Sequence, residues 1–127
     1  MNSIIKKNKI LILGGDSKIG KALYLDLIKN NLKVFKSTRR EKTGIDEFYL
    51  DLSIELDFSK LPNENYNFVF FCISITSIDF CKKNILETNN INVNQTIKLI
   101  NYFYKKGTFI VYFSTNLVFD GINHIMK

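Results

Sequence analysis

The sequence predicts an α/β domain built on a doubly wound parallel sheet of about five strands in the order 3-2-1-4-5. Short apolar runs alternate along the chain with segments of helical periodicity, and a glycine-rich turn directly follows the first run. The chain has 127 residues, 46% of them hydrophobic, which suits one domain with a core of its own. There is no linker, internal repeat or low-complexity tract, so residues 1–127 are expected to form a single domain.

The first βαβ unit is evident near the amino end of the chain. Residues 9–13 are a short apolar run that stops at a pair of glycines, as a buried parallel strand does before a tight turn. Asp16 or Ser17 can cap the helix that follows, in which apolar residues recur every three or four positions. Residues 32–35 then return to a strand, and the crossover between the two strands should be right-handed.

Three further apolar runs predict the rest of the sheet. A short third strand is expected over residues 47–50. The fourth is expected over residues 68–73, the most apolar run of the chain and therefore a central strand. Residues 109–113 complete the sheet as the fifth strand.

Two helices are predicted between the fourth and fifth strands. Residues 77–83 suit a short helix. Residues 86–106 suit a long amphipathic helix, which Gly107 closes as its C-terminal cap. The residues expected to face inward from this helix are Ile91, Val93, Ile97, Ile100 and Phe103.

Charge and cysteine content exclude several classes of function. The formal net charge of +6 forms no block of five like charges, so a solvated basic surface is favoured over a nucleic-acid-binding patch. Two cysteines are too few for a thiolate metal site, and Cys72 is expected to be a buried, reduced thiol. No signal peptide is recognised, and no apolar run approaches the roughly 18 to 20 residues that span a bilayer. We therefore expect a cytoplasmic protein with no metal.

The glycine-rich turn predicts a nucleotide site. Glycines let the chain turn tightly and let backbone N–H groups approach a pyrophosphate, which then faces the N-terminus of the following helix. The spacing G-x-x-G-x-x-G reads here as Gly14-x-x-Ser17-x-x-Gly20. Between a strand and a helix, this turn favours a Rossmann-like dinucleotide-binding domain over the alternative, a structural turn that binds nothing.

The end of the second strand predicts which dinucleotide binds. An NAD-preferring site usually carries an acidic residue there, and this chain has Arg39 and Arg40 instead. Guanidinium groups hold a 2′-phosphate through charge-assisted hydrogen bonds. NADP is therefore favoured over NAD, and the alternative is an ordinary basic loop.

Several segments carry a family resemblance. Residues 114–121, Ser-Thr-Asn-Leu-Val-Phe-Asp-Gly, resemble the S-T-D-x-V-F-D-G stretch of the dTDP-4-dehydrorhamnose reductase family, which is of the extended short-chain dehydrogenase/reductase type. Residues 76–81 resemble the T-x-V-D-x-[AC] segment of that family, and residues 92–96 its N-V-x-G-T helix motif. With the glycine turn, four motifs occur in the family's order across nearly the whole chain. The resemblance implies a Rossmann-like fold, an NADP cofactor and sugar-nucleotide reduction for polysaccharide synthesis.

The resemblance also implies roles for single residues. Thr115 matches the catalytic hydroxyl that hydrogen-bonds the substrate carbonyl, and Asn94 matches a helix asparagine on the cofactor side. Asp51 and Leu52 match a pair that lines the adenine pocket, and residues 72–74 match the turn that faces the nicotinamide half. Together with the turn and the arginines, the expected cofactor-binding residues are Gly14, Ser17, Lys18, Ile19, Gly20, Arg39, Arg40, Asp51, Leu52, Cys72, Ile73, Ser74 and Asn94.

The family's proton-transfer pair has no counterpart at its expected place. The chemistry needs a Tyr-x-x-x-Lys pair on a helix beyond the fifth strand. This spacing occurs at Tyr102 and Lys106, before the fifth strand, where a core or surface role is favoured. We therefore expect an NADP(H)-binding part of a sugar-nucleotide oxidoreductase, truncated at its carboxyl end relative to the family and not catalytic alone. The alternative is a non-catalytic nucleotide-binding or partner-binding regulatory module on the same fold.

The expected partners follow from the missing counterpart of the Tyr-x-x-x-Lys pair and of the family's C-terminal part. A nucleotide sugar is expected to bind only if a C-terminal piece completes the domain, and neither nucleic acid nor a membrane is expected to bind. The fifth strand carries no charge or proline that would block pairing, so it is predicted to be a hydrophobic edge. A homodimer or a hetero-complex through this edge is therefore expected.

Overall fold

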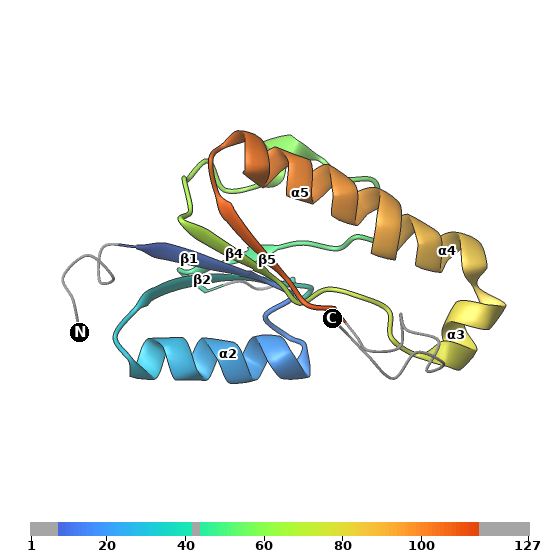
Figure 1. Ribbon diagram of the computed structural model, residues 1–127, viewed down its shortest axis with the longest axis horizontal. Helices are drawn as coiled ribbons and strands as arrows, with labels where there is room; N and C mark the ends of the chain where they lie inside the picture. Colours follow the sequence, from blue (N-terminus) through green and yellow to red (C-terminus); the bar gives the residue numbers. More distant parts are fainter. Residues whose placement is uncertain (1–7, 42–43, 115–127) are drawn as a thin grey trace, which may run out of the picture.

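The computed structural model describes residues 8–41 and 44–114, and within them it confirms the predicted sheet. Five strands lie side by side in the order β3-β2-β1-β4-β5, with helices on both faces (Figure 1). All four pairings between neighbouring strands are parallel. The strands are β1 (Lys9–Leu13), β2 (Lys33–Thr38), β3 (Glu47–Tyr49), β4 (Phe68–Phe71) and β5 (Phe109–Tyr112).

The helices divide between the two faces of the sheet. One face carries the first helix, and the other carries a rod formed by the last three helical segments (Figure 1). No helix in the described part of the chain is long and apolar enough to cross a membrane. The helices are α2 (Lys18–Lys29), η1 (Phe58–Lys60), α3 (Ile78–Lys83), α4 (Ile85–Asn89), η2 (Asn90–Gln95) and α5 (Thr96–Lys105).

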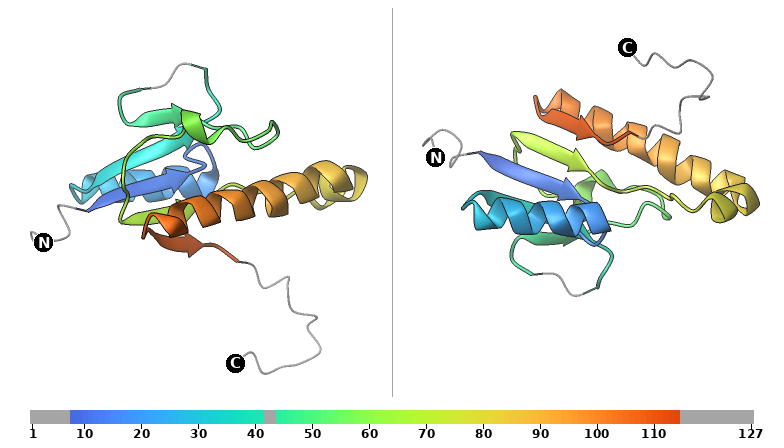
Figure 2. Two further views of the ribbon diagram at one scale, coloured as in Figure 1. Left: turned by 90° about the horizontal axis from the view of Figure 1, so that it is seen from above. Right: turned by 60° about the horizontal axis from the view of Figure 1, so that its bottom comes forward.

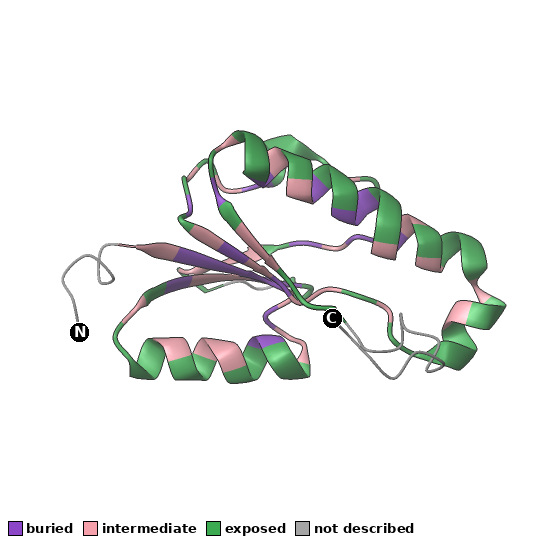
Figure 3. Ribbon diagram, viewed as in Figure 1, coloured by how far each residue is buried: buried purple, intermediate pink, exposed green. Residues whose placement is uncertain are grey.

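The core lies on both faces of β1, the central strand (Figure 3). Leu11 and Leu13 belong to the cluster that also contains Leu99 and Phe103 of α5, and Ile12 belongs to a second cluster that packs against α2. Successive side chains of a strand point to opposite faces, so a strand covered on both faces needs an unbroken apolar run. This requirement explains why residues 9–13 were recognisable in the sequence.

The face that carries α2 is covered over only part of its width. α2 lies over β1 and β2, and within the described residues no helix covers β4 and β5 on that side (Figure 2). Phe109 is 64% exposed there, and its ring lies edge-on to Phe68 with 5.7 Å between the ring centroids. The outer edge of β5 is unpaired in the same part of the chain. An apolar surface therefore adjoins a free strand edge.

The long helix predicted over residues 86–106 contains a π-helical segment that was not expected. Its middle is the π-helix η2, which widens the turn and changes which residues face the sheet. The prediction that Val93 and Ile97 face inward is wrong, because they are 42% and 52% exposed, whereas Gln95 and Thr96 are buried. Sequence periodicity assumes a constant 3.6 residues per turn, and the wide turn breaks that phase.

Candidate functional site

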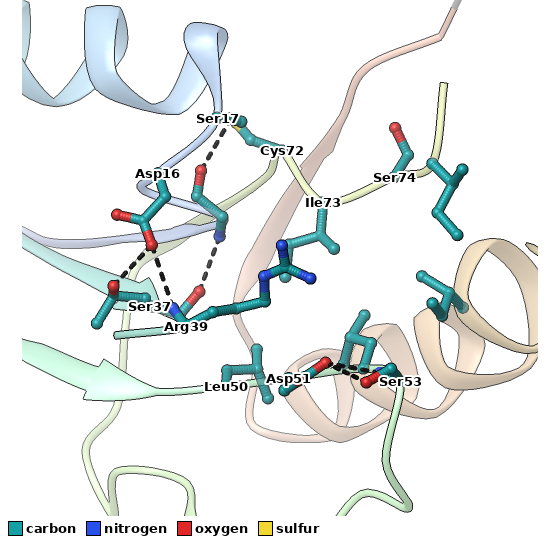
Figure 4. Close-up of a pocket in the computed structure, with 15 residues that line it drawn as sticks. Asp16, Ser17, Ser37, Arg39, Leu50, Asp51, Ser53, Cys72, Ile73 and Ser74 are labelled. Carbon is teal, nitrogen blue, oxygen red and sulfur yellow. Dashed lines mark hydrogen bonds between the residues drawn. The ribbon is translucent and has the colours of Figure 1, made fainter. Parts of the chain in front are cut away.

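A pocket of about 320 Å³ lies where the carboxyl ends of β1, β2 and β4 meet (Figure 4). Open parallel α/β sheets bind their ligands at this edge, at the point where the strand order reverses. In this chain the reversal falls at β1, between β2 and β4. The pocket is lined by Gly14, Asp16, Ser17, Ser37, Thr38, Arg39, Leu50, Asp51, Leu52, Ser53, Cys72, Ile73, Ser74, Ile75 and Ile91.

The glycine turn brings two loops into backbone contact. Gly14 has φ +87°, a conformation that favours glycine, and a Cβ there would lie 2.8 Å from the carbonyl oxygen of Cys72. A Cβ on Gly20 would collide with the carbonyl oxygen of Gly14, so the first turn of α2 sits against the glycine turn itself. These two positions have no room for any side chain, and the absence of Cβ atoms is what brings the loops after β1 and β4 together.

Ser17 caps α2 and leaves two amides available. Its hydroxyl accepts a hydrogen bond from the Gly20 amide and donates one to the Gly14 carbonyl, both at 2.9 Å. The amides of Lys18 and Ile19 make no hydrogen bond to any described residue. A helix N-terminus with free N–H groups attracts anions, so this end of α2 can hold a phosphate.

Buried Ser37 fixes the glycine turn to β2. Its side-chain oxygen accepts a 2.8 Å hydrogen bond from the Gly14 amide, and its carbonyl accepts one from the Gly15 amide at 3.0 Å. Ser37 is 1% exposed, so water does not compete for these bonds. The pocket therefore has a rigid corner between the first two strands.

At the end of β2 an acidic residue from the glycine turn meets the two arginines. Asp16 accepts a 2.6 Å hydrogen bond from the Thr38 hydroxyl and a 3.1 Å bond from the Arg39 amide, and it lies 3.5 Å from the Arg40 guanidinium. Burial alone would raise the pKa of Asp16, but these hydrogen bonds and the charge of Arg40 bring it below its ordinary value. Asp16 is therefore a carboxylate at neutral pH.

Arg39 and Arg40 are adjacent in the sequence, but their side chains point in different directions. Arg39 lines the pocket, and its guanidinium extends into the space that the other lining residues surround (Figure 4). Arg40 is not among the lining residues and instead pairs with Asp16. Only one of the two cations is therefore free to meet a ligand directly.

Besides the glycine turn and the end of β2, the segment after β3 forms a wall of the pocket. Asp51 accepts two hydrogen bonds from Ser53, one from its hydroxyl at 2.7 Å and one from its amide at 2.9 Å. These bonds lower the pKa of Asp51, and the positive charge of Arg39 contributes in the same direction. Leu52 is 3% exposed and provides apolar surface beside this polar group. A polar group beside an apolar side chain suits a nucleoside.

The loop after β4 forms another wall of the pocket, and hydrogen bonds from Asn92 of η2 fix its position. The Asn92 side chain accepts a 2.8 Å hydrogen bond from the Ile75 amide and donates a 2.9 Å bond to the Ile75 carbonyl. Cys72 lies at the start of this loop, and burial raises the pKa of its thiol to about 11. It is a free thiol, as expected from the sequence, but it is half-buried and not buried as predicted.

Eight of the thirteen residues expected to bind a cofactor lie around this single pocket. Lys18, Ile19, Gly20, Arg40 and Asn94 do not line it, and Asn94 is exposed on η2. Thr115, the expected catalytic residue, lies outside the described residues. Seven further lining residues were not predicted from the sequence: Asp16, Ser37, Thr38, Leu50, Ser53, Ile75 and Ile91.

Some of the missed residues carried a signal. Ser37 and Thr38 directly precede the arginines, and Leu50 and Ser53 flank Asp51 and Leu52. Because ligands of parallel α/β sheets lie beyond the strand ends, these neighbours were candidates by position alone. Asn92 was part of the quoted helix motif, but nothing in the sequence showed that its side chain reaches Ile75.

The literal Tyr-x-x-x-Lys spacing has a packing role, as the sequence analysis favoured. Tyr102 stacks on Phe58 with 5.1 Å between ring centroids, and it contacts Phe103 edge-on. The Lys106 ammonium lies over the Tyr102 ring, 4.6 Å from its centroid. These contacts belong to α5, whose carboxyl end leads into β5, so they lie away from the carboxyl ends of the strands.

The sheet order, the glycine turn and the pocket at the switch point define a Rossmann-like doubly wound α/β domain. Comparison with family descriptions then gives a specific assignment. The family described as the RmlD substrate binding domain matches residues 8–126, and the chain belongs to this family. A search of curated proteins finds no match.

Solved structures share the fold at low sequence identity. MoeE5 in complex with UDP-glucose and NAD has a TM-score of 0.76 at 22% identity, over 93% of this chain and 40% of that chain. The Helicobacter pylori ADP-L-glycero-D-manno-heptose-6-epimerase has a TM-score of 0.77 at 15% identity, over 97% and 44%. The Bacillus anthracis dTDP-4-dehydrorhamnose reductase, in complex with NADP, has a TM-score of 0.75 at 20% identity, over 93% and 40%. The chain thus spans about two fifths of the length of these structures.

Proposed function

We propose that the chain is the NADP(H)-binding part of a sugar-nucleotide oxidoreductase related to dTDP-4-dehydrorhamnose reductase. The observation that carries the proposal is the pocket at the switch point, which is lined by the glycine turn and the Arg39 side chain and lies beside the N-terminus of α2. Family membership supports the sugar-nucleotide class. The NAD and NADP complexes of structural neighbours support a nicotinamide dinucleotide.

The residues of the pocket and of the adjoining N-terminus of α2 fit the parts of such a cofactor. The free amides of Lys18 and Ile19 suit the pyrophosphate, because they are donors at the positive end of α2. The wall formed by Asp51 and Leu52 suits the adenosine, and the loop that begins at Cys72 suits the nicotinamide half. The bound cofactor would supply or accept a hydride, while these residues bind and orient it.

The 2′-phosphate of NADP is assigned to Arg39. Its guanidinium lies in the pocket and has no salt-bridge partner among the described residues, so it is available for a charge-assisted hydrogen bond. We therefore expect NADPH to bind more tightly than NADH. The chain is not expected to reduce a sugar nucleotide alone, because the ring of Tyr102 is committed to packing.

Calorimetric titration with NADPH and with NADH tests the proposal. Arg39→Ala should cost about tenfold or more in NADPH affinity, because one charge-assisted contact contributes about 1.5 to 3 kcal/mol. The double variant Arg39→Ala with Arg40→Ala should abolish the preference. Lys105→Ala removes the same charge from the far end of α5 and serves as the matched control. Absence of binding by the parent chain would overturn the proposal, and equal affinities for the two cofactors would overturn the assignment of Arg39.

A further inference from the structure

The strongest unassigned feature of the pocket is the position of the Asp16 carboxylate. It belongs to the glycine turn, but it lies against the end of β2, where a Rossmann-like site distinguishes NAD from NADP. Residues 33–41 contain an acid only at Glu41, beyond both arginines. The structure therefore brings a negative charge to this position from 22 residues earlier in the chain.

The donors around Asp16 are those that a 2′-phosphate would need. The Thr38 hydroxyl, the Arg39 amide and the Arg40 guanidinium all converge on this carboxylate. Two acceptors that share a donor lie roughly 4 to 6 Å apart. A carboxylate and a phosphate at that distance repel each other and compete for the same hydrogen bonds.

We propose that Asp16 is a specificity-determining residue that limits the preference for NADP. Its carboxylate occupies the donors at the end of β2 and opposes the 2′-phosphate, while Arg39 attracts that phosphate from the pocket side. NADH has no 2′-phosphate and meets no such repulsion. The inference rests on the proposed function, and its consequence is a chain that accepts both cofactors with only a modest preference for NADPH.

The charges that face Asp16 come from β2 and from the loop after it. Arg40 forms the ion pair, and the Lys36 ammonium adds a weaker attraction that also lowers the pKa of Asp16. Lys36 itself is 3.2 Å from Glu47 and lies over the ring of Tyr24, so its charge is shared with other groups. Asp16 therefore stays negative over the pH range in which the cofactors are studied.

Asp16→Asn is the decisive substitution, because asparagine keeps the size and an acceptor oxygen for Thr38 and Arg39 while it removes the charge. We expect the variant to bind NADPH about tenfold more tightly than the parent does, whereas its NADH affinity should not rise, because NADH has no phosphate at this position. Asp26→Asn, which removes a charge from the exposed surface of α2, is the matched control and should change neither affinity.

Calorimetry with both dinucleotides measures the ratio of affinities, and adenosine 2′,5′-bisphosphate against 5′-AMP isolates the adenosine half. The inference is supported if Asp16→Asn strengthens binding of the bisphosphate and NADPH selectively. It is overturned, with the proposed function intact, if the parent binds a dinucleotide and the variant leaves the ratio unchanged or lowers it. If the parent binds neither dinucleotide, the proposed function and this inference both fail. Thermal unfolding of the variant, expected within a few degrees of the parent, shows that its fold is retained.

Discussion

The reactivity of the Cys72 thiol is set by its burial in the pocket wall. The thiol is half-buried beside the glycine turn, and burial raises its pKa to about 11. The thiolate is the reactive form, so at pH 8 only about one thiol in a thousand is ready to react. The residue is therefore suited to packing in the pocket wall and not to nucleophilic chemistry.

We predict that Cys72 reacts slowly with iodoacetamide and that its rate rises about tenfold for each pH unit up to about pH 10. The sign follows from the raised pKa, because the reactive thiolate is scarce below it and accumulates as the pH approaches it. The measurement uses Cys81→Ser, in which Cys72 is the single thiol, and Cys72→Ser shows the contribution of Cys81. A rate that levels off near pH 8 would contradict the buried thiol, and protection by NADPH would place the cofactor against it.

At the scale of elements, the loop after β4 depends on a clamp from the neighbouring helix. Asn92 makes both of its hydrogen bonds to the backbone of Ile75, whereas Asn94, two residues further along η2, is exposed and makes none to a described residue. Asn92 acts as a positioning residue, because it holds a pocket wall without lining the pocket itself. The two asparagines therefore form a natural matched pair.

Asn92→Ala should lower the free energy of unfolding by about 1 to 3 kcal/mol, because it leaves the Ile75 amide without its side-chain partner and the Ile75 carbonyl with only the Cys81 thiol at 3.7 Å. It should also weaken NADPH binding, because the loop after β4, to which we assign the nicotinamide half of the cofactor, is no longer held. Asn94→Ala should change both quantities little. Denaturant unfolding and calorimetric titration of the two variants are the measurements, and equal effects would show that the clamp does not position the loop.

The elements themselves were largely predictable. All five strands were recognisable as apolar runs, and their alternation with helices predicted the sheet order. β2 continues to Thr38, beyond the predicted run of residues 32–35, which missed its last three residues because they are polar. The cap at Ser17 and the turn at Gly107, with φ +76°, follow from local rules of helix ends. The π-helix η2 could not be predicted in this way, because its wide turn depends on tertiary packing and has no signature in the local hydrophobic periodicity.

The site was predictable only where it follows chain order. The glycine turn and the ends of β2, β3 and β4 were expected to meet, since parallel strands end at one edge of the sheet. The approach of Asp16 to Thr38 and the separation of Arg39 from Arg40 were not expected. Both depend on side-chain directions across the gap between two loops, which spacing along a sequence does not specify.

At the scale of the whole molecule, the uncovered side of β4 and β5 is the most conspicuous feature. Phe109 is exposed on this side, and in the described residues β5 pairs with β4 alone. An apolar face beside a free strand edge favours association with another chain. The partner remains a proposal, either a second copy or a separate piece that covers this side.

We predict that the purified chain self-associates with increasing concentration and that Val111→Lys shifts it toward the monomer. Val111 is partly exposed, and it alternates with Ile110, which packs against the core, so a lysine there meets the open face of the sheet. Phe109→Lys, at a more exposed position, tests the same surface with less risk to the fold. Light scattering provides the masses, and a parent chain that stays monomeric at high concentration would refute the prediction.

The wide turn of η2 also has an evolutionary consequence. A π turn holds about one residue more than an α turn, so the removal of a single codon within residues 93–95, between Asn92 and α5, would restore an ordinary helix there. Everything on α4 would then rotate by about 100° relative to α5, the angle per residue of an α-helix. Asn92 would turn away from the loop after β4 without any change in its own chemistry. The contact between Asn92 and Ile75 therefore depends on the number of residues in η2. A relative with one residue fewer in this segment would need another contact to hold the loop after β4.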